Sequence, residues 1–77
     1  MIKDILEVLI KNMVEDKEGV TITEKNDEKG SVFEVKVARA DMGKVIGKQG
    51  RVAKSIRTIM RAISSREQKR ITIEFVD

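Results

Sequence analysis

The chain has 77 residues, which predicts one domain spanning residues 1–77, and it contains neither histidine nor cysteine. These residues are the commonest general base, the best nucleophile and the usual zinc ligands, so we expect no catalysis, no small-molecule substrate and no metal or other cofactor. The net charge of +3 conceals an asymmetry, because residues 36–70 hold eleven basic and two acidic residues, a net charge of +9, whereas residues 1–35 carry −4. One part of the molecule is therefore suited to anionic partners.

Residues 2 to about 15 are predicted to form an amphipathic helix. Its apolar side chains recur at helical spacing, at Ile2, Ile5, Leu6, Leu9, Ile10 and Met13. The polar run from Glu15 to Gly19 ends this helix, with Gly19 near its C-terminus. From Val20 to about Lys25, apolar side chains alternate with threonine, which predicts a first strand.

The turn residues Asn26 to Gly30 predict a hairpin, so the next strand, residues 31–38, should return antiparallel to the first. The apolar face of this second strand consists of Phe33, Val35 and Val37. Asp41 follows, and we expect its carboxylate to cap a short helix ending at Ile46 by accepting a hydrogen bond from a free backbone N–H of the first turn.

A helix of about 15 residues is predicted after Gly50. Its apolar side holds Val52, Ala53, Ile56, Ile59, Met60 and Ile63, and its polar side holds Lys54, Arg57, Arg61 and Ser65. This pattern ends around Ser64-Ser65-Arg66, and Ile71, Ile73 and Phe75 then alternate with polar residues in a final strand. The order α-β-β-α-α-β predicts a two-layer α+β domain, in which the helices cover one face of a three-stranded sheet.

Two glycines, Gly47 and Gly50, lie between the two predicted helices. The glycine spacing differs from that of a P-loop and from that of the dinucleotide-binding fingerprint. Gly-x-x-Gly between helices in a small α/β domain is the arrangement that clamps about four nucleotides of a single strand. Backbone N–H groups of the loop and the positive end of the helix beginning at Arg51 would bind phosphate, with Lys48 adding attraction. A tight turn between helices would use the same glycines, so it is the basic segment and the element order that favour nucleic acid.

The segment Ile46-Gly-Lys-Gln-Gly50 resembles the core of a KH domain, as do its flanks from Met42 to Val45 and from Arg51 to Lys54. The element order resembles the prokaryotic type II arrangement. Length, the acidic first helix and the run from Val37 to Gly43 are similar to the small single-domain bacterial RNA-binding proteins of the KhpA type. The resemblance implies a cytoplasmic RNA chaperone or post-transcriptional regulator that forms homodimers, pairs with a larger KH-containing partner of the KhpB type, and is linked to cell elongation and division.

The resemblance also places bases in a groove between the two helices that flank the loop and the neighbouring strand. The residues expected to contact single-stranded RNA are Arg39, Lys44, Val45, Ile46, Gly47, Lys48, Gln49, Gly50, Arg51 and Lys54, with Val37 and Val52 as further groove candidates. Phe33 and Phe75 are expected in the core, so we expect no aromatic stacking on bases and little sequence selectivity. We interpret Arg57 and Arg61 as a solvated polar face. Met60 and Ile63 are candidates for a dimer interface if they face outward.

The alternative hypothesis, from another functional class, is a protein-interaction domain whose RNA affinity is incidental. It is motivated by the small core and by the lack of tyrosine and tryptophan. A salt titration separates the two hypotheses, because phosphate-mediated binding weakens steeply with ionic strength. A membrane location is not expected, since no apolar run approaches the roughly 18 residues of a membrane span.

Overall fold

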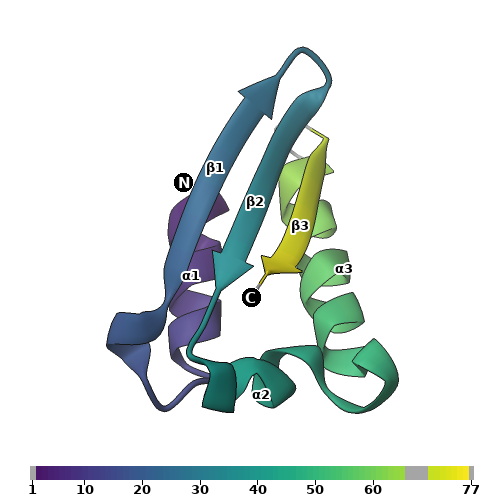
Figure 1. The fold of residues 1–77 in the computed structure, drawn as a ribbon. Helices are drawn as coiled ribbons and strands as arrows, with labels where there is room; N and C mark the ends of the chain where they lie inside the picture. Colours follow the sequence, from purple (N-terminus) through teal and green to yellow (C-terminus); the bar gives the residue numbers. More distant parts are fainter. Residues whose placement is uncertain (1, 66–69, 77) are drawn as a thin grey trace.

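A computed structural model describes residues 2–65 and 70–76, and its elements follow the predicted order (Figure 1). The elements are α1 (Ile2–Lys11), β1 (Thr21–Asp27), β2 (Gly30–Lys36), α2 (Met42–Ile46), α3 (Arg51–Ser65) and β3 (Ile71–Val76). Short 3-10 turns lie at Lys17–Gly19, Arg39–Asp41 and Lys48–Gly50. Arg66, at the expected end of the last helix, and Lys69, in the basic segment, lie outside the described residues.

The three strands form one mixed sheet in the order β1-β2-β3. The predicted antiparallel hairpin is confirmed for β1 and β2, whereas β3 pairs parallel to β2. A parallel pair needs a crossover, and the helices α2 and α3 provide it. The carboxyl ends of β2 and β3 therefore meet at the same end of the sheet, where Lys36 pairs with Val76 and where α2 lies (Figure 1).

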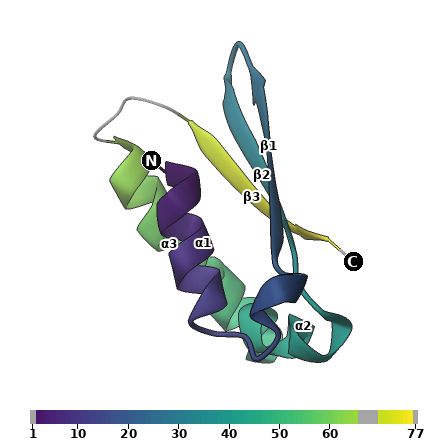
Figure 2. The same cartoon turned by 90° about the vertical axis from the view of Figure 1, so that its left-hand side faces the viewer.

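Helices α1 and α3 lie side by side on one face of the sheet, which confirms the predicted two-layer α+β class (Figure 2). The apolar sides of the two helices face the apolar side of the sheet, because each layer can bury its apolar surface only against the other. The core consists of Ile2, Leu6, Ile10, Val14, Ile22, Phe33, Val35, Val37, Val45, Ile56, Met60, Ile71 and Ile73. The other face of the sheet is polar, with Thr21, Thr23 and Thr72 exposed and an ion pair of 3.2 Å between the Lys25 Nζ and Glu34 Oε1 atoms.

The first helix ends at Lys11, four residues earlier than predicted. The side chain of Asn12 donates a hydrogen bond of 2.7 Å to the Val8 carbonyl oxygen, and such side-chain bonds compete with continued helix. Gly19 does not end the helix, because it lies in a separate turn where its N–H donates to the Asp16 carboxylate at 3.1 Å.

The hairpin turn is tighter than predicted, because β1 continues to Asp27 and only Glu28 and Lys29 connect the strands. One carboxylate oxygen of Asp27 accepts the N–H groups of Lys29 and Gly30 at 2.8 and 2.9 Å, which fixes the turn locally.

The prediction that Asp41 caps α2 with its side chain is wrong. Asp41 precedes the helix, but its carboxylate accepts no hydrogen bond from a backbone N–H of the first turn. Asp41 is only 3% exposed. Its carboxylate instead accepts hydrogen bonds from the backbone N–H groups of Glu15 and Asp16, at 3.2 and 3.0 Å. Asp41 therefore does not cap its own helix but bonds to the turn that follows α1. These two hydrogen bonds connect the end of α1 to the start of α2.

Helix α3 is rotated about its axis relative to the prediction. Its buried line is Ala53, Ile56, Met60 and Ser64. Met60 is fully buried and therefore no dimer-interface candidate, whereas Ile59, expected on the core side, is 45% exposed. Val8 on α1 is 61% exposed, so each of the two neighbouring helices presents one large hydrophobic side chain to solvent. In the described part of the chain, no helix has the length and apolar character that crossing a lipid bilayer requires.

Candidate nucleic-acid interface

The loop Gly47–Gly50 connects α2 to α3 at the end of the molecule where β2 and β3 finish (Figure 1). The side chains of Lys48 and Gln49 are exposed, and both glycines are half-buried. Among the described residues, no salt bridge engages Lys48, Arg51 or Lys54. Within residues 2–65 and 70–76, the loop is therefore neither packed into the core nor neutralised by an acidic partner.

The backbone of the loop requires glycine at Gly47. This residue has φ of 76° and ψ of 175°, a region that is essentially restricted to glycine. A Cβ atom added to Gly47 would lie 2.4 Å from the Cγ2 atom of Val52. Gly50 also has a positive φ, 73°, but a Cβ there would meet no atom within 4 Å. Gln49 adopts the left-handed conformation with φ of 56°, so three of the four loop residues are in unusual conformations.

Part of the hydrogen-bonding capacity of the loop is used internally. The N–H of Gly47 donates to the Gly43 carbonyl at 2.9 Å, the N–H of Gly50 to the Gly47 carbonyl at 3.2 Å, and the N–H of Arg51 to the Lys48 carbonyl. Within the described chain these bonds do not use the N–H groups of Lys48 and Gln49, which can therefore meet an anion at the N-terminal end of α3.

Basic side chains continue from the loop along α3. Arg51 and Lys54 are exposed and stand three residues apart, so they lie on neighbouring turns of the same helix. Arg39 is also exposed, and it lines a hollow of about 240 Å³ together with Lys36, Val37 and Met42, without the loop residues. The structure thus groups the loop with the start of α3 and places Arg39 beside a neighbouring hollow.

Lys44, one of the residues expected to contact RNA, is engaged with acidic groups in this structure. Its Nζ atom lies 3.3 Å from a carboxylate oxygen of Glu15 and 3.4 Å from one of Asp41. Desolvation alone would lower the pKa of Lys44, but the hydrogen bonds to Glu15 and Asp41 outweigh it and raise the pKa. The backbone N–H groups of Asp16 and Glu15, followed by Lys44, hold the pKa of Asp41 below its ordinary value. Glu15 is 29 residues away from Lys44 in the sequence, so no local pattern indicates this pair.

The predicted apolar groove wall is only partly available. Val45 is fully buried in the core, so its side chain presents no surface to a base in this structure, and its expected contact with a base stays a prediction. Val37 is also buried. Ile46 and Val52 are partly exposed and pack against the core from outside, which leaves them as the apolar side chains next to the loop.

Arg57 is not the solvated side chain that we expected. Its Nε atom donates a hydrogen bond of 3.1 Å to the backbone carbonyl of Ile73 in β3, and its guanidinium carbon lies 5.6 Å from the centroid of the Phe75 ring. Phe75 is only partly buried, whereas Phe33 is buried as predicted. Sequence reasoning missed this pair, although the placement of Phe75 at the last positions of a strand is a signal that its burial is incomplete.

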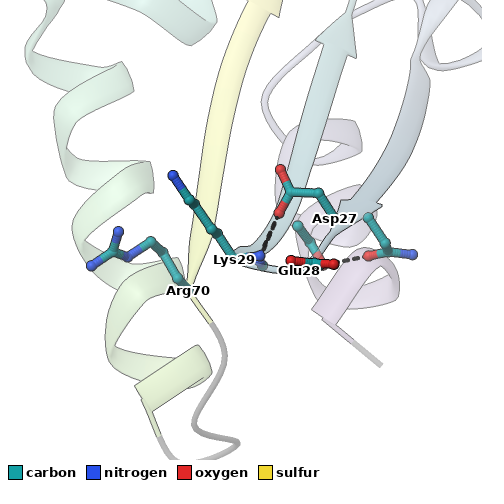
Figure 3. Close-up of a pocket in the computed structure, with 7 residues that line it drawn as sticks. Asp27, Glu28, Lys29 and Arg70 are labelled. Carbon is teal, nitrogen blue, oxygen red and sulfur yellow. Dashed lines mark hydrogen bonds between the residues drawn. The ribbon is translucent and has the colours of Figure 1, made fainter.

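A second hollow, of about 310 Å³, lies at the hairpin tip (Figure 3). The tip is at the opposite end of the sheet from α2 and the loop (Figure 1). Its lining comprises Asn26, Asp27, Glu28, Lys29, Gly30, Ser31 and Arg70. Figure 3 shows the Asp27 carboxylate bonded to Lys29 of the turn, with the side chain of Arg70 projecting nearby. Two acidic and two basic side chains line this hollow, so it lacks the uniform positive charge found beside the loop.

Comparison with known proteins extends over nearly the whole chain. The family model described as KhpA/KhpB, KH domain, matches residues 3–75. The chain is similar to an RNA-binding protein KhpA of Clostridium acetobutylicum, with 45% identity over 74 residues that cover 96% of this chain and 99% of that protein. A protein of the same name from Aquifex aeolicus is 45% identical over 76 residues, covering 99% of this chain and 96% of the relative. That of Chlamydia pneumoniae is 39% identical over 75 residues, with 97% and 96% covered.

Proposed function

The chain belongs to the KhpA/KhpB family of KH domains, and from that premise we propose that it acts as a single KH domain, residues 1–77, that binds single-stranded RNA through the loop Gly47–Gly50 and the start of α3. The observation that carries this proposal is the loop itself, which is exposed, tightly bent and free of acidic partners among the described residues. The family is not enzymatic, in line with the lack of histidine and cysteine as catalytic groups.

The proposed binding mode relies on the sugar-phosphate backbone. Because Gly50 lacks a side chain at a position that faces open space, the strand can approach the loop closely there, and the N–H groups of Lys48 and Gln49 can donate to a phosphate. The dipole of α3 favours negative charge at its N-terminus, and the exposed side chains of Arg51 and Lys54 extend the attraction. Ile46 and Val52 offer apolar contact to a base. Contacts of this kind give affinity with little sequence selectivity.

Replacing Lys48 and Gln49 together by aspartate tests this mode. Aspartate tolerates the left-handed conformation of Gln49, so the loop should still fold, but its charge now repels phosphate. We expect the affinity for a fluorescently labelled single-stranded RNA, measured by anisotropy, to fall by about tenfold or more. The double variant Lys3→Asp, Thr72→Asp makes the same change in charge at exposed positions of α1 and of the open face of the sheet, and it serves as the control. Unchanged affinity in a loop variant with a native circular dichroism spectrum would remove the loop from the mechanism.

We further propose that the protein self-associates or pairs with a larger KH-containing protein of the KhpB type. The support is the exposure of Val8 and Ile59 on the two neighbouring helices, since exposed large hydrophobic side chains commonly mark contacts. Membership of the family motivates the remaining proposals, which are a cytoplasmic location and a role as RNA chaperone or post-transcriptional regulator linked to cell elongation and division.

The same two side chains favour a second candidate function, a protein-interaction module whose RNA affinity is incidental. Salt dependence separates the candidates. RNA binding through phosphates should weaken by about 0.7 logarithmic units for each phosphate contact and tenfold rise in salt, whereas an apolar protein interface should barely respond. Binding of RNA that is insensitive to salt would favour the second candidate.

A further inference from the structure

We infer that Arg57, held against Phe75 and the edge of β3, contacts a base of the bound RNA strand. This inference rests on the proposed RNA-binding function and deepens it. The loop and the start of α3 provide contacts to phosphate, and Arg57 adds a contact that depends on the presence of a base.

Two interactions fix the position of the Arg57 guanidinium. Its Nε atom is hydrogen-bonded to the carbonyl oxygen of Ile73 at 3.1 Å, and its central carbon lies 5.6 Å from the centroid of the Phe75 ring. An arginine held in this way loses little further side-chain freedom when it binds a ligand. By contrast, Arg61, one turn further along α3, is exposed, and its side chain makes no hydrogen bond or ion pair among the described residues.

The terminal amino groups of Arg57 remain available. Within the described chain, the side chain of Arg57 donates one hydrogen bond, to Ile73, and that bond uses the Nε atom alone. No buried side-chain nitrogen or oxygen of the described residues lacks a partner. The terminal nitrogens of Arg57 must therefore reach solvent, although the residue as a whole is half-buried. They form an oriented pair of donors next to an aromatic ring.

The position of Arg57 is within reach of a strand bound at the loop. Arg57 stands six residues after Arg51 in α3, which is a rise of about 9 Å along the helix axis. Phe75 lies near the carboxyl end of β3, the end of the sheet at which α2 and the loop are found (Figure 1). A strand of about four nucleotides clamped by the loop can extend over this distance.

The chemistry of the pair suits a base better than a phosphate. Unstacked bases of single-stranded RNA stack on aromatic rings and on the planes of arginine guanidinium groups, and they accept hydrogen bonds on their edges. The exposed side chains of Lys54 and Arg61 already supply mobile positive charge along the same helix. A guanidinium of fixed plane beside a ring adds shape and stacking, which a phosphate does not need.

The variant Arg57→Lys separates the two chemistries, because it keeps the charge and removes the plane. The ligand is an eight-nucleotide single-stranded RNA, together with a set in which each position in turn lacks its base. We expect the wild-type protein to lose about tenfold in affinity when one particular base is removed, and the variant to bind the intact RNA about tenfold more weakly. When the base at that one position is removed, the affinity of the variant should not fall any further. Arg61→Lys is the matched control and should change each affinity by less than about twofold.

A second variant keeps the inference testable if Arg57→Lys fails to fold. Phe75→Leu retains apolar packing but removes the ring, and it should lose sensitivity to the same base as Arg57→Lys. The inference is overturned if Arg57→Lys binds like the wild type, or if it loses affinity equally for every base-deleted RNA while its salt dependence is unchanged. Failure of the proposed function would look different, because the wild-type protein itself would then bind none of these RNAs.

Discussion

Replacing Gly47 by alanine should destabilise this fold far more than the same change at the two neighbouring glycines. Gly47 has φ of 76° and ψ of 175°, and a Cβ atom there would lie 2.4 Å from Cγ2, 2.9 Å from Cβ and 3.0 Å from the backbone nitrogen of Val52. The first atom could move with a side-chain rotation, but the last belongs to the backbone of α3. Gly50 has φ of 73° with open space around it, and Gly43 has open space and lies in α2.

The magnitudes follow from these three environments. A left-handed conformation costs an ordinary residue about 1–2 kcal/mol, which is the whole effect expected for Gly50→Ala. At Gly47 the forced contact with Val52 adds about 1–3 kcal/mol, for a total of about 2–5 kcal/mol. Gly43→Ala should instead stabilise by up to about 1 kcal/mol, because alanine favours a helix. A domain of this size is stable by about 4–12 kcal/mol, so Gly47→Ala could remove a large share.

Urea unfolding followed by circular dichroism measures this series, with the free energies of unfolding compared at a common slope. The cycle with Val52→Ala isolates the steric part, since removal of the Cγ atoms should restore some of the stability lost in Gly47→Ala. Equal losses for Gly47→Ala and Gly50→Ala, or no restoration by Val52→Ala, would refute the idea that close contact with α3 dictates glycine at this position.

Three further predictions concern charge and association. The bonds that Asp41 accepts from two backbone N–H groups hold its folded-state pKa below the unfolded value of about 3.9, so its stabilising effect is present above that pH and is lost as the pH falls through the folded value. Asp41→Asn should therefore lower the urea midpoint at pH 7 and flatten the fall of stability in acid, and an unchanged midpoint at pH 7 would contradict this. Arg51→Ala should reduce the slope of log affinity for RNA against log salt by about 0.7, whereas Lys25→Ala on the open face of the sheet should leave the slope unchanged. Ile59→Glu should abolish self-association in analytical ultracentrifugation while Thr58→Glu does not, and a persistent oligomer would place the interface elsewhere.

The element order and the apolar faces could be predicted because they depend on local periodicity. Alternation at Phe33, Val35 and Val37, and helical spacing in residues 2–11, directly reflect a sheet and helices that are each covered on one side. The glycine loop could also be predicted, because its conformational demands lie within four consecutive residues.

The contacts that sequence reasoning missed join residues that are distant in the chain. Asp41 bonds to the turn after α1, and Arg57 bonds to β3. Periodicity gives the apolar arc of a helix but not its rotation against the sheet, which is why Ile59 is exposed and Val45 is buried. These tertiary contacts determine which basic side chains remain available to a ligand. The composition of the candidate site therefore depends on them as well as on the Gly-x-x-Gly motif.

The proposed mode of RNA binding is tested most directly by a nuclear magnetic resonance titration of the isotope-labelled protein with short single-stranded RNA. The backbone amide signals of Lys48, Gln49 and Arg51 should shift progressively as RNA is added. The signals of Thr21 and Thr23, which are exposed on the open face of the sheet, should keep their chemical shifts. Shifts concentrated on the open face of the sheet, with the loop signals unmoved, would contradict the proposal that the loop binds the RNA backbone.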